Sequence, residues 1–318
     1  MKKSRSTRTA QIALLACGLL VVAVGTASVT AAAVASSAPP RVSTAGFPSG
    51  GTNPGIFTDT CTRSRTAPDD PIMMPGMTGM SMQHDFFGNP TVDASSTSSA
   101  LLDGKTTCTT SADASAYWTP VVYQNGKALQ PQQALIYWRA PAQTASSVQT
   151  MPAGITMIAG NETATAPQST SQIDWTCTTS PQQAKAGVTV RSDAPQDCPG
   201  GSLLRLVITF PNCWDGHTLD GKSKENVVYA DPAGCPTSHP VQIPQIVFHV
   251  AYPTSSGASI SLSTGPQTQG PPVTGHADFM DGWHQPTMNA DVAACIDTQT
   301  RCGPVFGADA TPRGGRVR

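Results

Sequence analysis

The sequence has few charged residues, and glutamate is nearly absent from it. Charged side chains make up 12% of the chain, and only Glu162 and Glu225 are glutamates. Helices usually carry Glu, Lys, Leu and Ala on their faces, so this composition disfavours a helical protein. Thr, Ser, Val, Gln, Pro and Gly dominate instead, which is typical of short strands joined by turns. We therefore expect a mainly β fold.

A long apolar run is missing everywhere except near the N-terminus. Four basic residues precede an apolar stretch over 12–24, and an A-x-A cleavage site ends at Ala35. This order is typical of a secretory signal, so we assign 1–35 to a signal peptide and expect a secreted protein. An uncleaved signal or a lipid on Cys17 would anchor the chain to a membrane. Both are minor alternatives, because the apolar core of about 13 residues is shorter than a membrane span and continues past Cys17.

An excess of basic residues is also lacking. Removal of the signal leaves 15 of the 19 basic residues against 20 acidic ones, a formal charge of about −5. A nucleic-acid partner would require a basic face, so we expect none. No further segment is apolar enough to span a membrane, and no pattern indicates an oligomeric state.

The cysteines lack the C-x-x-C spacing of common zinc sites. Eight remain after the signal, and an even number in an exported chain predicts four disulfides. The pairing stays open because eight cysteines allow 105 pairings, although Cys295 and Cys302 are the best candidates for a local pair. The eight are Cys61, Cys108, Cys177, Cys198, Cys213, Cys235, Cys295 and Cys302.

Turn residues and composition divide the chain into four parts. Residues 36–56 are rich in Ser, Ala, Pro and Gly and predict a flexible linker, 57–305 form one β-rich domain, and 306–318 form a disordered tail. Within the domain we expect one helix over 287–296. The expected strands are 134–138, 155–158, 203–210, 245–252 and 259–262. Many short strands, few short helices and long loops favour a single sandwich-like, disulfide-stapled domain.

Four polar and aromatic regions hold most of the candidate functional residues. They are 83–89, 116–120, 210–216 with 235–240, and 276–283. Their H-D-F-F-G-N, Y-W-x-P, F-P-x-C-W-D-G, C-P-x-x-H-P-V-x-I-P and H-A-D-F-x-x-G-W segments resemble, in type and order, the exported-protein family DUF1996 over about 70–296. The label denotes a domain of unknown function. The resemblance therefore implies kinship and export, and no catalytic residues. Members occur in bacteria and fungi and can accompany carbohydrate-binding modules.

The chain departs from this family at one position. Members often carry H-x-H before the D-F-x-G-N segment, whereas this chain has Met82-Gln83-His84. If the first histidine is a metal ligand in relatives, the thioether of Met82 replaces it here. That replacement argues against a zinc-type site.

The candidate catalytic residues are two histidines and three aspartates of these regions. His276 and Asp278 are two apart, so in a strand they would share a face and could act as general base and orienting partner, or as two ligands of one metal. His84 and Asp85 are adjacent and would point to opposite faces. Asp215 could supply the second carboxylate that glycoside cleavage needs. Whether the protein is an enzyme stays open.

The tryptophans of these regions suggest a carbohydrate partner. Trp118, Trp214 and Trp283 could stack on sugar rings, although for each one taken alone a place in the core is the simpler explanation. The first hypothesis is thus an exported protein that binds or cleaves extracellular or cell-wall polysaccharide. In the alternative, the protein is a non-catalytic structural or adhesive envelope domain whose histidines and aspartates only cap loops.

A methionine-rich stretch precedes His84 and supports a further alternative. Five methionines lie within residues 73–82. Thioethers are soft ligands, so Met77, Met80 and Met82 with His84 could bind copper or another metal ion. Methionines that merely fill gaps are the simpler explanation. No phosphate loop or dinucleotide fingerprint indicates another cofactor.

Overall fold

Residues 55–102, 104–140, 148–178 and 192–304 are described by a computed structural model. The expected signal peptide at 1–35 and tail at 306–318 lie outside these residues. Of the expected linker at 36–56, only the last two residues are described, and the first strand already begins at Ile56.

Short strands dominate the described residues, as the composition predicts. The 17 strands are β1 Ile56–Ala67, β2 His84–Gly88, β3 Ala116–Pro120, β4 Val122–Gln124, β5 Lys127–Ala128, β6 Gln133–Arg139, β7 Thr156–Gly160, β8 Ile173–Thr178, β9 Leu203–Thr209, β10 Cys213–Trp214, β11 Val227–Val228, β12 Val241–Gln242, β13 Gln245–Ala251, β14 Ile260–Ser263, β15 Gln269–Gly270, β16 His276–Met280 and β17 Arg301–Pro304. All five expected strands are present, with bounds that differ by one or two residues.

The helices in the described part of the chain are short. They are α1 Ser98–Leu101, the 3₁₀ turns η1 Pro199–Gly201 and η2 Pro272–Thr274, α2 Gln285–Asp291 and the π-helical turn η3 Val292–Ile296. The helix expected over 287–296 therefore exists, but it begins at Gln285 and changes to π-helical hydrogen bonding for its last turn.

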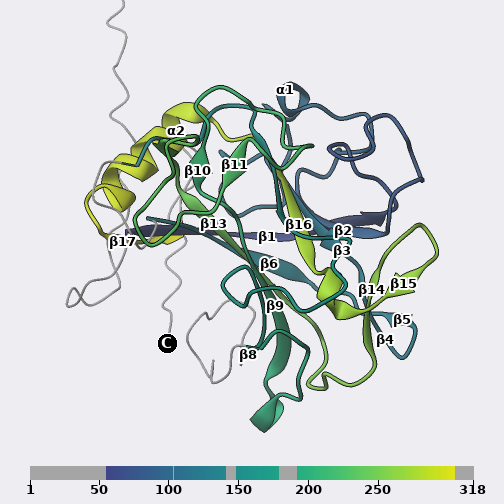
Figure 1. Ribbon diagram of the computed structural model, residues 1–318. Helices are drawn as coiled ribbons and strands as arrows, with labels where there is room; N and C mark the ends of the chain where they lie inside the picture. Colours follow the sequence, from purple (N-terminus) through teal and green to yellow (C-terminus); the bar gives the residue numbers. More distant parts are fainter. Residues whose placement is uncertain (1–54, 103, 141–147, 179–191, 305–318) are drawn as a thin grey trace, which may run out of the picture. The chain divides into compact units, whose positions relative to one another are not determined.

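Ten strands form the main sheet, and the long strand β1 joins its two halves. The order is β7-β16-β3-β2-β1-β6-β13-β9-β8, with β17 added beside β1 (Figure 1). The first part of β1 pairs with β6 and the last part with β2, and the register shifts between Arg63 and Arg65. Such an irregularity bends a strand. We call β7-β16-β3-β2 the first half-sheet and β6-β13-β9-β8 the second.

Aromatic side chains pack the two half-sheets together. Tyr117 of β3 stacks on Phe248 of β13 with ring centroids 6.0 Å apart, and Trp138 of β6 meets Phe279 of β16 at 5.6 Å. All four side chains are fully buried. Burial of such large apolar groups is the main stabilising contribution, and it makes the domain sandwich-like, as predicted.

The two ends of the strand order approach each other, so the sheet is nearly closed. Gly160 of β7 has a positive φ of 84°, and a Cβ there would lie 2.9 Å from Cδ1 of Ile173 in β8 and 2.6 Å from the Gly275 carbonyl. Only glycine accommodates both the backbone conformation and the close approach.

The outer face of the first half-sheet is also buried. Side chains of 72–101 pack on Phe86, Trp118, Ile158 and Met280 and form a second apolar cluster there. Consequently the polar side chains that lie on this same face of the strands are buried as well.

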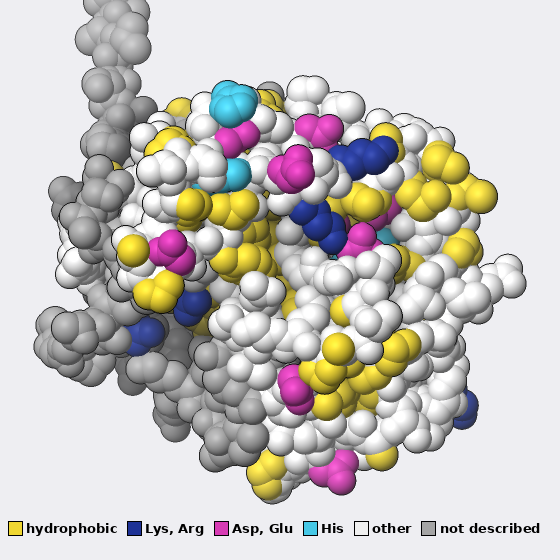
Figure 2. All heavy atoms as spheres, in the orientation of Figure 1, with side chains coloured by type: hydrophobic (Ala, Val, Ile, Leu, Met, Phe, Trp, Pro, Cys, Tyr) yellow, Lys and Arg dark blue, Asp and Glu magenta, His cyan; other side chains and the backbone are white. Residues whose placement is uncertain are grey.

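Four disulfides staple the domain, as the cysteine count predicts. The pairs are Cys61–Cys108, Cys177–Cys198, Cys213–Cys235 and the expected local pair Cys295–Cys302. No described helix is long and apolar enough to cross a membrane. On the face shown in Figure 2, charged side chains are few and the hydrophobic side chains form separate patches, in keeping with the low charge content.

Candidate functional site

Strand register brings three of the candidate residues together on the outer face of the first half-sheet. His276 and Asp278 lie on one face of β16, because residues two apart in a strand point the same way. Asp278 pairs with Trp118 of β3, which in turn pairs with Phe86 of β2. His84 is two residues before Phe86 and therefore shares that face.

The side chains of this cluster converge. One ligand atom from each of His84, His276 and Asp278 lies within 4.8 Å of the other two. Nε2 of His276 is 4.0 Å from Oδ2 of Asp278, and the two imidazole rings are 5.8 Å apart at nearly a right angle. We call these three residues the His–His–Asp cluster.

Backbone carbonyls fix the tautomer of both histidines. Nδ1 of His84 lies 3.0 Å from the carbonyl oxygen of Asp69, and Nδ1 of His276 lies 2.8 Å from that of Thr274. A carbonyl oxygen only accepts, so each Nδ1 carries the proton and donates it. Each Nε2 is left with a lone pair, which is the arrangement that metal-binding histidines adopt.

The cluster is buried and its inner polar atoms have no protein partner. Nε2 of His84 and both carboxylate oxygens of Asp278 accept no hydrogen bond from the described residues. Burial lowers the pKa of His84 and of His276 to about 4, so both imidazoles are neutral at pH 7. Burial also raises the pKa of Asp278 well above its usual value. Unpartnered buried polar atoms are costly, and here they belong to two neighbouring side chains, His84 and Asp278.

Three charged groups outside the cluster shift the pKa values of its residues. Asp70 and Glu162 both raise the pKa of His276 and that of Asp278, while Lys224 lowers the pKa of Asp278. The Lys224 ammonium donates to the Glu162 carboxylate and, at 3.3 Å, to the carbonyl oxygen of Gly160. The sequence patterns did not single out Glu162 or Lys224; the near absence of glutamate was the only signal that pointed to Glu162.

The other candidate carboxylates do not join the cluster. Asp85 follows His84 in β2 and points to the opposite side, where its carboxylate accepts from the Thr66 hydroxyl at 2.5 Å and lies 3.5 Å from Nη1 of Arg63. Burial raises the pKa of Asp85 to about 6. Asp215 forms a turn after β10, where its carboxylate accepts from the backbone N–H groups of His217 and Thr218.

The candidate tryptophans offer little surface to a sugar. Trp118 and Trp283 are fully buried in the core, where no ring could stack on them. Trp214 is partly buried, and its Nε1 donates to the Thr218 carbonyl oxygen at 2.7 Å. None of the three lies in an open aromatic cleft.

The candidate methionines lie on the turns that precede β2. Met77 and Met80 are exposed, with 47% and 56% of their surface accessible, and Met82 is partly buried two residues before His84. The exposed pair projects to solvent from successive turns, in which Met80 donates its backbone N–H to Met77.

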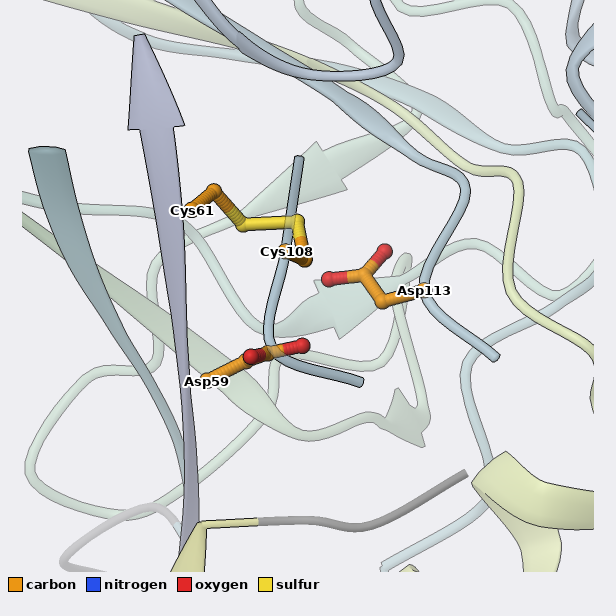
Figure 3. A group of neighbouring side chains, drawn as sticks. All are labelled: Asp59, Cys61, Cys108 and Asp113. Atoms are coloured by element: carbon orange, nitrogen blue, oxygen red, sulfur yellow. A yellow bond between two sulfur atoms is a disulfide. The ribbon is translucent and has the colours of Figure 1, made fainter. Parts of the chain in front are cut away.

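A second group of acidic side chains lies between the half-sheets, and sequence reasoning missed it. Asp59 alternates with Phe57 and Cys61 on the inward face of β1, and a charged residue on a core face is the signal that could have revealed it. Figure 3 shows Asp59 and Asp113 near the Cys61–Cys108 disulfide, and their ligand atoms lie within 4.8 Å of one another.

This second group is a carboxyl pair, because disulfide sulfurs are not thiolate ligands. Oδ1 of Asp59 accepts from the backbone N–H groups of Thr60, Thr109 and Thr110, whereas Oδ2 has no described partner. Burial raises the pKa of both aspartates, that of Asp113 to about 6, and the Asp113 carboxylate raises the pKa of Asp59 further. Two carboxyls this close favour a shared proton.

Comparison with known proteins identifies relatives of the chain but not their chemistry. The profile of a domain of unknown function, DUF1996, matches residues 70–283 and so covers both β2 and β16. No curated protein and no solved structure matches the chain.

Proposed function

Because the chain belongs to the DUF1996 family, whose description assigns no activity, we propose a function from the site itself: an exported metal-binding domain. His84 and His276 bind the ion through Nε2, and Asp278 binds it through a carboxylate oxygen. One observation carries the proposal: one ligand atom from each of these three buried residues lies within 4.8 Å of the other two, and Nε2 of His84 and both carboxyl oxygens of Asp278 have no described hydrogen-bond partner.

The donor set suits a divalent transition metal. Imidazole nitrogen and carboxylate oxygen bind zinc, copper(II) and related ions, at about 2.0–2.2 Å for zinc. Donors around a tetrahedral ion of that size lie roughly 3.4 Å apart. The 4.0 Å between His276 Nε2 and Asp278 Oδ2 therefore closes with a small side-chain movement. Carbonyl partners on both Nδ1 atoms support the imidazoles in the required orientation.

The four disulfides support the exported part of the proposal, because disulfides persist in oxidising compartments. Polysaccharide cleavage gains no support from the geometry. Asp85, Asp215 and Asp278 point to three different environments, so no two of them form the carboxylate pair that such cleavage needs. If protein groups fill every coordination position of the ion, the ion serves stability alone, and the domain is a metal-stabilised structural or adhesive module.

Metal titration of the secreted, disulfide-bonded protein tests the proposal. After chelation, Zn²⁺, Cu²⁺ and Co²⁺ are titrated separately by calorimetry. We expect one ion per chain, and about 100-fold weaker binding in His276→Gln and Asp278→Asn variants. Near-ultraviolet circular dichroism checks that each variant is folded.

Asp215 and His217 provide matched controls, because they form a close aspartate–histidine pair, Oδ2 to Nε2 3.5 Å, in an exposed turn. Asp215→Asn and His217→Gln should leave the affinity unchanged. The proposal fails if the folded wild-type protein takes up no ion, or if the His276→Gln variant binds as tightly as wild type.

A further inference from the structure

Two segments enclose the His–His–Asp cluster. On one side, the turn at 69–73 holds His84 through the Asp69 carbonyl, and its Asp70 carboxylate accepts the backbone N–H groups of Ile72 and Met73. On the other side, the ammonium of Lys224 reaches over the edge strand β7 to the carbonyl oxygen of Gly160.

Lys224 is therefore placed beside the cluster by strand register. Gly160 pairs with His276 in the antiparallel alignment of β7 and β16. An ammonium bound to the Gly160 carbonyl lies one strand away from a proposed ligand. Glu162, two residues after Gly160, accepts from the same ammonium.

The Glu162–Lys224 ion pair is the part of these surroundings that solvent reaches. The Glu162 and Lys224 side chains are 20% and 29% exposed, against 4% for His276 and 1% for Asp278. Asp70, the third charged group acting on the cluster, is buried. An ion approaching from solvent meets the ion pair before it meets the cluster.

A groove of about 550 Å³ lies farther along the same strands. Ile72, Lys222 and Met280 of β16 are among the residues that line it. Met280 is two residues after Asp278 and lies on the same face of that strand. None of the lining residues belongs to the cluster or to the ion pair, so the groove is separate from both.

The backbone at Lys224 is held in an unfavourable conformation. Its φ is +60°, in the left-handed region that residues other than glycine, asparagine and aspartate rarely adopt, and its N–H donates to the Gly221 carbonyl. Such a conformation is strained and persists only where the surrounding structure imposes it. Here it directs the ammonium toward Gly160 and Glu162.

The proposed ion has one coordination position left over. His84, His276 and Asp278 supply three donors, so the fourth position of a tetrahedral ion is open to water or to a further side chain. The Glu162 carboxylate is the partly exposed acidic group beside the cluster, and it is already paired with a cation. A metal ion offers that carboxylate a stronger, divalent partner than an ammonium.

We infer that the Glu162–Lys224 ion pair is the gate of the metal site. In the metal-free protein, Lys224 holds Glu162 at the rim and supplies positive charge to a group of buried carboxylates. When the ion enters, Lys224 turns to solvent and Glu162 turns inward as the fourth ligand. This inference rests on the proposed metal-binding function.

A double-mutant cycle on the secreted protein tests the gate. Zn²⁺ affinity is measured calorimetrically for wild type, Lys224→Met, Glu162→Gln and the double variant. We expect Lys224→Met to bind about tenfold more tightly, since a competing positive charge is removed, and Glu162→Gln to bind roughly 10–100-fold more weakly. In the Glu162→Gln background, Lys224→Met should change the affinity by less than about twofold, because the lysine acts through the glutamate.

Cobalt(II) spectra give a second measurement. Loss of a fourth protein ligand in Glu162→Gln should shift the visible absorption bands, while Lys224→Met should keep the wild-type bands. Lys222→Met and Glu225→Gln are matched controls in the same segment, and both should bind and absorb as wild type does.

The outcomes separate the two ideas. If folded wild type binds no Zn²⁺ or Co²⁺, the metal-binding function fails and the gate fails with it. If wild type binds but Glu162→Gln keeps its affinity and spectrum, or Lys224→Met tightens binding equally in both backgrounds, the gate alone is overturned.

Discussion

The buried pair of Asp59 and Asp113 predicts that the domain loses stability as the pH rises from acidic to neutral. Both folded-state pKa values are raised, by burial first, so the folded protein binds more protons than the unfolded chain in this range. Stability is then fully present below the unfolded pKa of 3.8 and is lost as the pH rises through the folded values. Asp281, whose pKa is raised to about 7 by burial and also by Asp113, acts in the same direction.

The size of the effect follows from the Asp113 value. A pKa raised from 3.8 to about 6 corresponds to about 3 kcal/mol of unfolding free energy at pH 7. No solvent screening reduces it, because both side chains are fully buried. The Tyr117 hydroxyl and the Ser115 N–H already stabilise the Asp113 carboxylate, so the raised pKa of Asp113 arises from its burial.

The substitution Asp59→Asn should remove the cost of ionising Asp59 itself, whose pKa is raised well above 3.8 by burial and by Asp113. Its amide oxygen can still accept from Thr109 and Thr110, and its NH₂ group replaces the unpartnered Oδ2 as a donor facing Asp113. We expect the stability gain of the variant over wild type to increase steadily from pH 4.5 to pH 7.5, where it should reach about 3 kcal/mol.

Urea unfolding at several pH values between 4.5 and 7.5, with the disulfides intact, measures this difference. Asp297→Asn, at an exposed position near the end of the domain, is the control and should run parallel to wild type. If the curves of wild type and Asp59→Asn stay parallel across the range, or if the variant is less stable at pH 7.5, the shared-proton reasoning is refuted.

Three other outcomes are expected. Leucine at both Met77 and Met80 should leave metal affinity and stability within experimental error, because these exposed side chains contact solvent; weaker Cu(I) binding under reducing conditions would instead support the methionine site. Removing the Cys177–Cys198 bridge, which closes a loop of 21 residues, should lower the unfolding free energy by about 3 kcal/mol, measured by urea unfolding. Gly160→Ala should lower the melting temperature by several degrees, since its Cβ has no room; an unchanged melting temperature would contradict the close approach of β7 and β8.

Local patterns in the sequence predicted much of the fold. The strand at 245–251 is bounded by prolines and rich in β-branched and aromatic residues, and both features act locally. The even cysteine count also predicted the four disulfides. Disulfide formation depends on the compartment, so the prediction needed no knowledge of tertiary contacts. The π-helical turn at 292–296 was not foreseen, because hydrophobic spacing does not distinguish it from an α-helix.

The candidate site was only partly predictable. The two-residue spacing of His276 and Asp278 is a local property and predicts a shared face. That His84 joins them depends on β3 lying between β2 and β16, a pairing between segments almost 200 residues apart. Burial of Trp118 and Trp283 likewise depends on which faces of the sheet other segments cover. The identity of a single residue does not reveal this coverage.

The pairing of β1 with β17 has a consequence for how the domain is made. The strand that begins the domain lies in register with the strand that ends it, Ile56 opposite Arg301. A chain that emerges N-terminus first leaves one edge of its first strand unoccupied until almost the last residues of the domain have appeared. Contacts this distant in sequence form slowly, so this edge of the sheet is completed only after nearly the whole domain has been synthesised.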